Sequence, residues 1–263
     1  MTFKMYFMKI IHPLKILLYF VFFGTFTSTA QDWSSLATKA PWLNYFFSKM
    51  SPNTPEFTAT GAMAFCNPQG TVQFIMPMDL AVSSNCFRWQ ADAMKIWPMP
   101  SQARTLAKLT HTDTIVFLTK KDERTVYMIY PGVQAYIPIP IPDSALAEYD
   151  TRSGTIQIQK TELGQETLLG HPCIKYKAID TEPNVPPQEG LIWGATDLQG
   201  FPIGMVLHSE RGLMKFNFQD VQIRNPDLSL FVIPSNYISF TNSADLLNYA
   251  REKFQDTQNT ISQ

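Results

Sequence analysis

The sequence has few residues of the kinds that enzymes and metal sites use. It contains 3 cysteines and 4 histidines in 263 residues. It lacks the H-E-x-x-H, C-x-x-C and G-x-S-x-G motifs, a glycine-rich phosphate loop and the spacing of a calcium loop. Charged residues make up 16 % of the chain, the net charge is −1, and no basic run offers a surface for nucleic acid. The composition therefore favours a non-enzymatic protein without a metal ion or a cofactor.

The first thirty residues have the features of a secretory signal peptide. Three lysines give a positive start, an apolar run at 16–26 is too short to span a bilayer, and Ser28 and Ala30 precede the expected cleavage site. An uncleaved membrane anchor is the alternative. We expect cleavage after Ala30, export to the periplasm or the medium, and one domain at 31–263 that is soluble after cleavage, since no later segment is a long apolar run.

From Phe57 to about residue 240, apolar residues recur mainly with a period of two. In 72–82 they occupy every second position without exception, and similar runs follow at the hairpin spacing that antiparallel strands allow. Residues 33–50 and 243–254 have helical spacing instead, with Ser243 as the expected N-cap of the second segment. The pattern predicts an α+β fold in which a continuous antiparallel meander is flanked by an N-terminal and a C-terminal helix.

The segment YIPIPIPD at 136–143 carries three prolines at alternate positions. In an extended chain these prolines remove N–H donors along one edge and leave the other edge able to pair. We favour a strand that protects the edge of the sheet, and the alternative is a polyproline lid over it.

The alternation also selects a set of residues for the inner face of the sheet. These side chains are methionines and aromatic residues, which suit a flexible surface that accommodates apolar partners. The candidate ligand-binding residues are Met63, Phe74, Met76, Met78, Phe87, Trp89, Trp193, Met205, Met214 and Phe216. Either this face holds a lipid or another apolar ligand, or the terminal helices fill it as an ordinary core.

Several reactive side chains crowd into 171–177, the sequence HPCIKYK. Strand alternation directs Cys173, Lys175 and Lys177 to the outer face, while Ile174 and Tyr176 point inward. A lysine near a thiol can lower its pKa, but a solvated pair of lysines is ordinary on the outer face of a strand. We interpret the segment as a structural strand rather than a catalytic site.

The three cysteines lie in a chain that we expect to be exported, where disulfides can form. Cys66 ends one predicted strand and Cys86 begins another, at opposite ends of the strand between them. About ten residues at roughly 3.3 Å each separate these ends, whereas bridged Cα atoms lie within about 7 Å. We expect Cys66 and Cys86 not to be bonded to each other.

Three longer motifs carry a resemblance to a known group of proteins. They are LGQETLLGHPCIKYK at 163–177, LIWGATDLQGFPI at 191–203 and DLSLFVIPSNYISF at 227–240. Together they resemble a family of exported bacterial proteins that is grouped with the LolA-like superfamily, the periplasmic lipoprotein carriers. CFRWQADA at 86–93 and TVYMIYPGVQAY at 125–136 also look like strands of those carriers.

The resemblance implies a strongly curved, unclosed half-barrel whose concave apolar face is capped by the helices. It also implies an envelope-related protein that holds a lipid, an acyl chain or another apolar ligand. The carriers have an arginine shortly before the aromatic-x-Trp pair, whereas this chain has none at 81–85, and Arg88 is expected to face outward. An envelope assembly protein with a filled core and a protein partner, such as a lipoprotein, is the second expectation.

Overall fold

A computed structural model describes residues 56–147, 157–182, 185–209 and 212–261. The expected signal peptide and the expected helix at 33–50 lie outside the described residues. The strands of the described chain form one sheet, and their bounds are β1 Phe57–Cys66, β2 Val72–Val82, β3 Cys86–Asp92, β4 Thr114–Lys120, β5 Thr125–Tyr130, β6 Ala135–Pro140, β7 Gln157–Leu168, β8 His171–Glu182, β9 Val185–Ala195, β10 Phe201–Ser209, β11 Gly212–Gln222 and β12 Ile238–Ser239.

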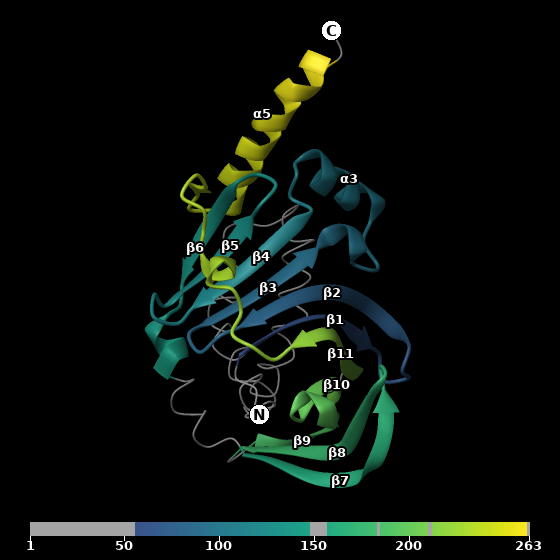
Figure 1. The fold of residues 1–263 in the computed structure, drawn as a ribbon. Helices are drawn as coiled ribbons and strands as arrows, with labels where there is room; N and C mark the ends of the chain where they lie inside the picture. Colours follow the sequence, from purple (N-terminus) through teal and green to yellow (C-terminus); the bar gives the residue numbers. More distant parts are fainter. Residues whose placement is uncertain (1–55, 148–156, 183–184, 210–211, 262–263) are drawn as a thin grey trace, which may run out of the picture.

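The sheet is strongly curved and does not close into a barrel (Figure 1). Its strand order is β12-β6-β5-β4-β3-β2-β1-β11-β10-β9-β8-β7, so β12 and β7 lie at opposite edges. Neighbouring strands are antiparallel except for the short parallel pair of β12 and β6. The α+β architecture with an unclosed half-barrel is therefore confirmed.

The strand order differs from the continuous meander that the sequence predicts. Strands β1 to β6 form one meander and β7 to β11 form a second, and the chain passes from one edge of the sheet to the other between β6 and β7. The two meanders meet where β1 pairs with β11, for example at Met63 and Phe216. Local hairpin spacing cannot reveal this junction, because the paired strands are far apart in the sequence.

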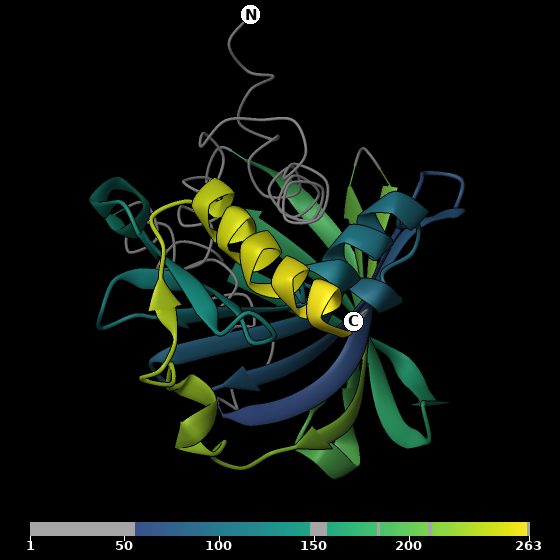
Figure 2. The same ribbon diagram turned by 90° about the horizontal axis from the view of Figure 1, so that it is seen from above.

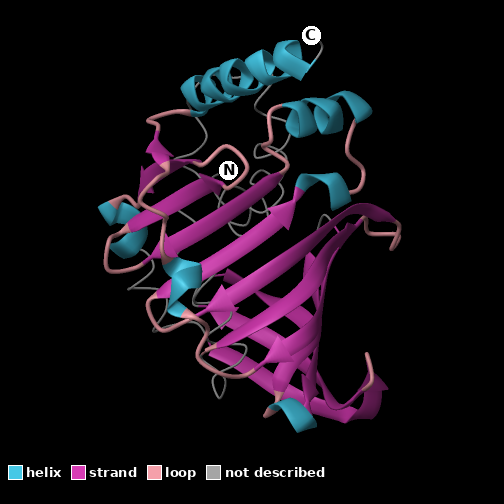
Figure 3. Ribbon diagram, turned by 45° about the horizontal axis from the view of Figure 1, so that its top comes forward, coloured by secondary structure: helices cyan, strands magenta, loops and turns pink. Residues whose placement is uncertain are grey.

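Two α-helices lie together at one end of the sheet (Figures 2 and 3). Helix α3, Ser101–Leu109, separates β3 from β4 and was not expected, since the sequence analysis placed no helix between the strands. Helix α5 runs over Ser243–Ile261, and its Leu246 and Ala250 are buried in the cluster of the inner face. The rings of His111, which follows α3, and Phe254 of α5 are in contact, with centroids 4.0 Å apart. This contact joins the two helical regions.

The start of α5 differs in detail from the prediction of Ser243 as the N-cap. Asn242 Oδ1 accepts a hydrogen bond from the backbone N–H of Asp245 at 2.9 Å. Asn242 therefore supplies the capping oxygen. Within the described residues, no helix is both long enough and apolar enough to cross a membrane.

The sequence predicts that the proline-rich strand β6 forms the edge of the sheet, whereas the structure places it second from the edge, inside β12. It pairs with β5 along its length, from Ala135 to Pro140. On its other side β12 reaches only Ala135 and Tyr136, which precede the prolines. The missing N–H groups of Pro138 and Pro140 thus block further strand addition.

Candidate functional site

A row of apolar side chains crosses the junction of the two meanders on the inner face. Met76 of β2 pairs with Met63 of β1, and Met63 pairs with Phe216 of β11. Phe216 pairs with Met205 of β10, which pairs with Ile192 of β9. Directly paired residues in antiparallel strands share a face, so these five side chains form one continuous strip, which we call the inner strip. Their exposed fractions lie between 1 % and 7 %.

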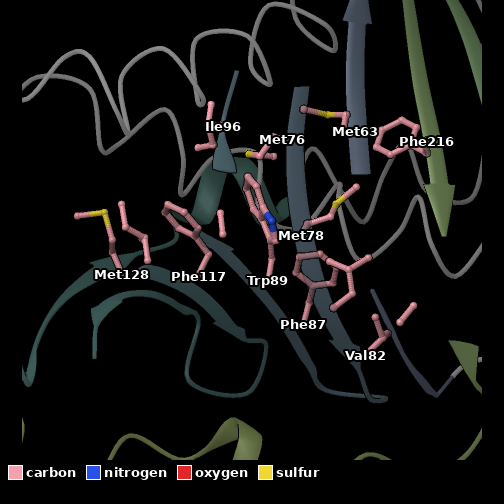
Figure 4. Packing of buried hydrophobic residues seen from close by; sticks show 14 of the residues in the cluster. Met63, Met76, Met78, Val82, Phe87, Trp89, Ile96, Phe117, Met128 and Phe216 are labelled. Carbon is pink, nitrogen blue, oxygen red and sulfur yellow. The ribbon is translucent and has the colours of Figure 1, made fainter. Parts of the chain in front are cut away.

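The other candidates of the first meander lie on the same face as the inner strip. Figure 4 shows Met63, Met76, Met78, Phe87 and Trp89 with Phe216 in one packed group. Phe74 and Met214 flank this group, because both pair with the buried Phe65. The structure thus brings together nine of the ten candidates, which are Met63, Phe74, Met76, Met78, Phe87, Trp89, Met205, Met214 and Phe216.

Trp193 is the exception, because the register places it on the outer face. It follows Ile192 of the inner strip and pairs with Lys175. Its indole N–H donates to Glu166, and the Lys175 ammonium lies 4.9 Å from its ring centroid. In the segment LIWGA, odd-numbered and even-numbered positions are both apolar. Alternation alone therefore does not tell which side chains face inward.

The apolar face continues beyond the predicted residues into the first meander. Trp89 pairs with Phe117 of β4, Phe117 pairs with Met128 of β5, and Met128 pairs with Ile137 of β6. Sequence reasoning missed these positions because β4 and β5 are apolar on both faces. The outer side of the same strands is buried by a second cluster, in which Val116 and Leu118 pack with Phe231.

Lys175 of the reactive segment at 171–177 lies on the outer face beside Trp193, as expected of a structural strand, whereas Cys173 is buried at 2 % exposure. Lys175 forms an ion pair with Glu166 at 3.1 Å, and Lys177 pairs with Glu189 at 2.9 Å. The Cys173 thiol donates to the backbone carbonyl of His171 at 3.3 Å.

The thiol and the imidazole of this segment are not arranged as a catalytic pair. The His171 ring meets Asp197 instead, at 2.8 Å from Nδ1 to Oδ2. Burial raises the pKa of the Cys173 thiol, which disfavours the reactive thiolate. Within the described residues, no three His, Cys, Asp or Glu side chains gather as metal ligands.

Cys66 and Cys86 occupy opposite ends of β2, as the sequence predicts. Cys66 pairs with Val72 at the beginning of β2, whereas Val82 at its end pairs with Phe87, the neighbour of Cys86. Both thiols are free.

Acid is expected to weaken the outer-face contacts of β7, β8 and β9. The pKa of the Glu166 carboxyl lies below its usual value of 4.5, first because it accepts the hydrogen bond of Trp193 and then because of Lys175. A lowered folded-state pKa contributes stability above pH 4.5 that is lost as the pH falls through the lowered value. Glu166→Gln should therefore lower Tm at neutral pH and match the wild type in acid. An equal difference in Tm at both pH values would contradict this assignment.

Comparison with known proteins gives matches among solved structures only. No protein-family model and no curated protein matches the chain. LprF from Mycobacterium bovis is 15 % identical, with a TM-score of 0.39 over 75 % of this chain and 98 % of that one. The lipoprotein LppX from Mycobacterium tuberculosis is 8 % identical, with a TM-score of 0.40 over 73 % and 98 %.

A third solved structure is also similar to this chain. A LolA superfamily protein from Nitrosomonas europaea is 9 % identical, with a TM-score of 0.32 over 74 % of this chain and 97 % of that one.

Proposed function

We propose that the chain is a non-enzymatic binding protein of the bacterial envelope, which holds a lipid, an acyl chain or another apolar ligand against its inner face. The inner strip carries this proposal. Five strands from both meanders contribute apolar side chains to one face, and neighbouring positions such as Lys175 and Asn217 place polar groups on the other. Burial of apolar surface stabilises by about 25 cal/mol per Å², so one acyl chain supplies several kcal/mol.

The described helices make their main contacts at one end of the first meander. The principal contacts of α5 are with β6, and those of α3 are with the short 3-10 helix η2, Ala93–Lys95. Both helices lie near the end of the first meander (Figure 3), and Leu246 and Ala250 of α5 pack into the cluster of the inner face. Export to the periplasm or the medium, as the first thirty residues predict, fits this role.

A pair of substitutions on neighbouring residues of β1 tests the proposal. Met63 belongs to the inner strip, whereas Ala62 pairs with Pro77 and Asn217 on the outer face. Met63→Gln should lower the affinity for 1-N-phenylnaphthylamine about tenfold, equivalent to about 1.4 kcal/mol, because it makes the face polar. Ala62→Gln should leave the fluorescence titration unchanged.

The wild-type protein provides the second readout of the same proposal. Native mass spectrometry of protein purified without detergent should show a bound lipid or acyl compound. If no lipid is retained and the fluorescence of 1-N-phenylnaphthylamine does not rise on titration, the binding function is refuted. Measured Tm values of both variants separate a loss of binding from a loss of folding.

The low exposure of the inner face favours a second candidate function, an envelope assembly protein with a filled core. Met78 is 6 % exposed and Met76 only 1 %. With a filled core, Met78→Asp would prevent folding, because an unpaired charge would be buried. With an open face, the variant would fold and fail to take up the fluorescent probe. Crosslinking in cells would capture a protein in the first case and a lipid in the second.

A further inference from the structure

The indole N–H of Trp89 is a buried hydrogen-bond donor without an acceptor. Trp89 is 4 % exposed, and its Nε1 contacts no hydrogen-bond partner within the described residues. Arg104 Nε, in helix α3, is the other buried side-chain nitrogen of the described residues without a partner. Trp193 donates to Glu166, and the buried Tyr130 hydroxyl donates to the sulfur of Met128 at 3.5 Å. Buried polar groups of native proteins are nearly always paired, so the Trp89 donor calls for an acceptor.

The surroundings of Trp89 direct this donor into the apolar inner face. Its ring stacks on Phe117 with centroids 5.2 Å apart, and across the strands it pairs with Leu80. Figure 4 shows the indole, with its nitrogen in blue, among Met76, Met78 and Phe117. These neighbours offer thioether sulfur at best, which is a weak acceptor.

The charge of the same region restricts the chemistry of an acceptor. The buried polar residues of the described chain are Thr110, Thr112 and Thr119. The part-buried Arg104 directs its Nη2 to the backbone carbonyl of Ile96 at 3.1 Å. A carboxylate at Trp89 would therefore be a buried charge without a cation, which is strongly unfavourable. A neutral carbonyl oxygen meets no such penalty.

We infer that the indole N–H of Trp89 donates a hydrogen bond to a neutral acyl carbonyl of the bound ligand, an ester or an amide. This inference rests on the proposed binding function and narrows its ligand class from apolar molecules in general to acylated ones. The inner strip contacts the hydrocarbon chain, and Trp89 fixes where the carbonyl lies along it. An unsubstituted hydrocarbon leaves the donor unpaired and binds less tightly.

Two probes of similar size separate these ligand classes, methyl laurate with an ester carbonyl and tridecane without an acceptor. Displacement of 1-N-phenylnaphthylamine should show about tenfold tighter binding of methyl laurate to the wild-type protein. In NMR spectra assigned by triple resonance, the Trp89 indole proton should move downfield with methyl laurate and stay in place with tridecane.

Substitution of the donor gives the matched comparison. Trp89→Phe removes the N–H and should abolish the preference for the ester while retaining binding of tridecane. Trp97→Phe is the control, because Trp97 is 50 % exposed and should leave the preference intact. If Trp89→Phe does not fold, β-(3-benzothienyl)alanine at position 89 keeps the bicyclic shape without the donor.

The possible outcomes distinguish this inference from the proposed function. Equal binding of both probes with an unmoved indole proton overturns the role of Trp89 and leaves the binding function standing. Binding of neither probe to the wild-type protein overturns both. A downfield shift together with loss of the ester preference in the substituted protein supports both.

Discussion

Gly61→Val is expected to destabilise the protein by about 3 kcal/mol, a large effect for a single added side chain. Gly61 lies in β1 at the junction of the two meanders, where it pairs with Phe218 of β11 and Met78 of β2. A Cβ atom at this position would lie 2.5 Å from the carbonyl oxygen of Asn217 and 3.0 Å from the Phe218 ring. Because backbone of β11 would have to move, the pairing that joins the meanders would weaken.

Urea denaturation measures this effect as a change in the free energy of unfolding. The matched control is Ala62→Val, which introduces the same β-branched side chain at the next residue. Ala62 lies on the outer face, and no glycine is replaced. We expect the control to change stability by less than about 0.5 kcal/mol, as is usual for a partly exposed strand position. An unchanged midpoint for Gly61→Val would show that β11 accommodates the side chain and would contradict the proposed close contact.

Phe201→Ala is expected to destabilise the protein by about 3 to 5 kcal/mol, since it removes a fully buried aromatic ring. Phe201 is 0 % exposed, and its ring centroid lies 4.9 Å from that of Phe57 and 5.8 Å from that of Phe218. The three rings come from β10, β1 and β11, so they pack the two meanders against each other. Edge-to-face contacts of this kind add to the burial of apolar area.

Thermal and chemical denaturation of Phe201→Ala should be compared with Phe240→Ala. Phe240 is only half-buried and its ring contacts Tyr249 of α5, with centroids 5.3 Å apart. Its removal should therefore cost less than the removal of Phe201. Equal losses in the two variants would mean that the three-ring contact does not hold the junction together.

Much of the strand structure follows from the local sequence. The period of two in 72–82 fixes both the existence of β2 and the faces of its side chains, because every second residue is apolar. Helix α3 was missed because most of its nine residues are polar, as in a surface loop. Only Ala103 and Ala107 are buried. The prediction thus succeeds where burial differs sharply between faces and fails where a short element buries little.

The candidate site shows the same division. Alternation places Met63, Met76 and Phe216 correctly on one face, because their strands have a polar face for contrast. It does not fix the side of Trp193 or reveal Phe117, because their strands are apolar on both faces. That Met63 and Phe216 are paired neighbours depends on the junction of β1 with β11, which no local pattern encodes.

The junction also determines how the chain must assemble. Thr60 of β1 and Gln219 of β11 are 159 residues apart in the sequence, yet they are paired in the sheet. Each meander can form from neighbouring hairpins. Joining the two meanders requires the closure of a very long loop, and the entropy lost in closing it is offset only after the contacts between β1 and β11 have formed. Until then β1 and β11 are bare edges that can pair with other molecules. An incompletely folded chain is thus most vulnerable to aggregation at the strands that later form its centre.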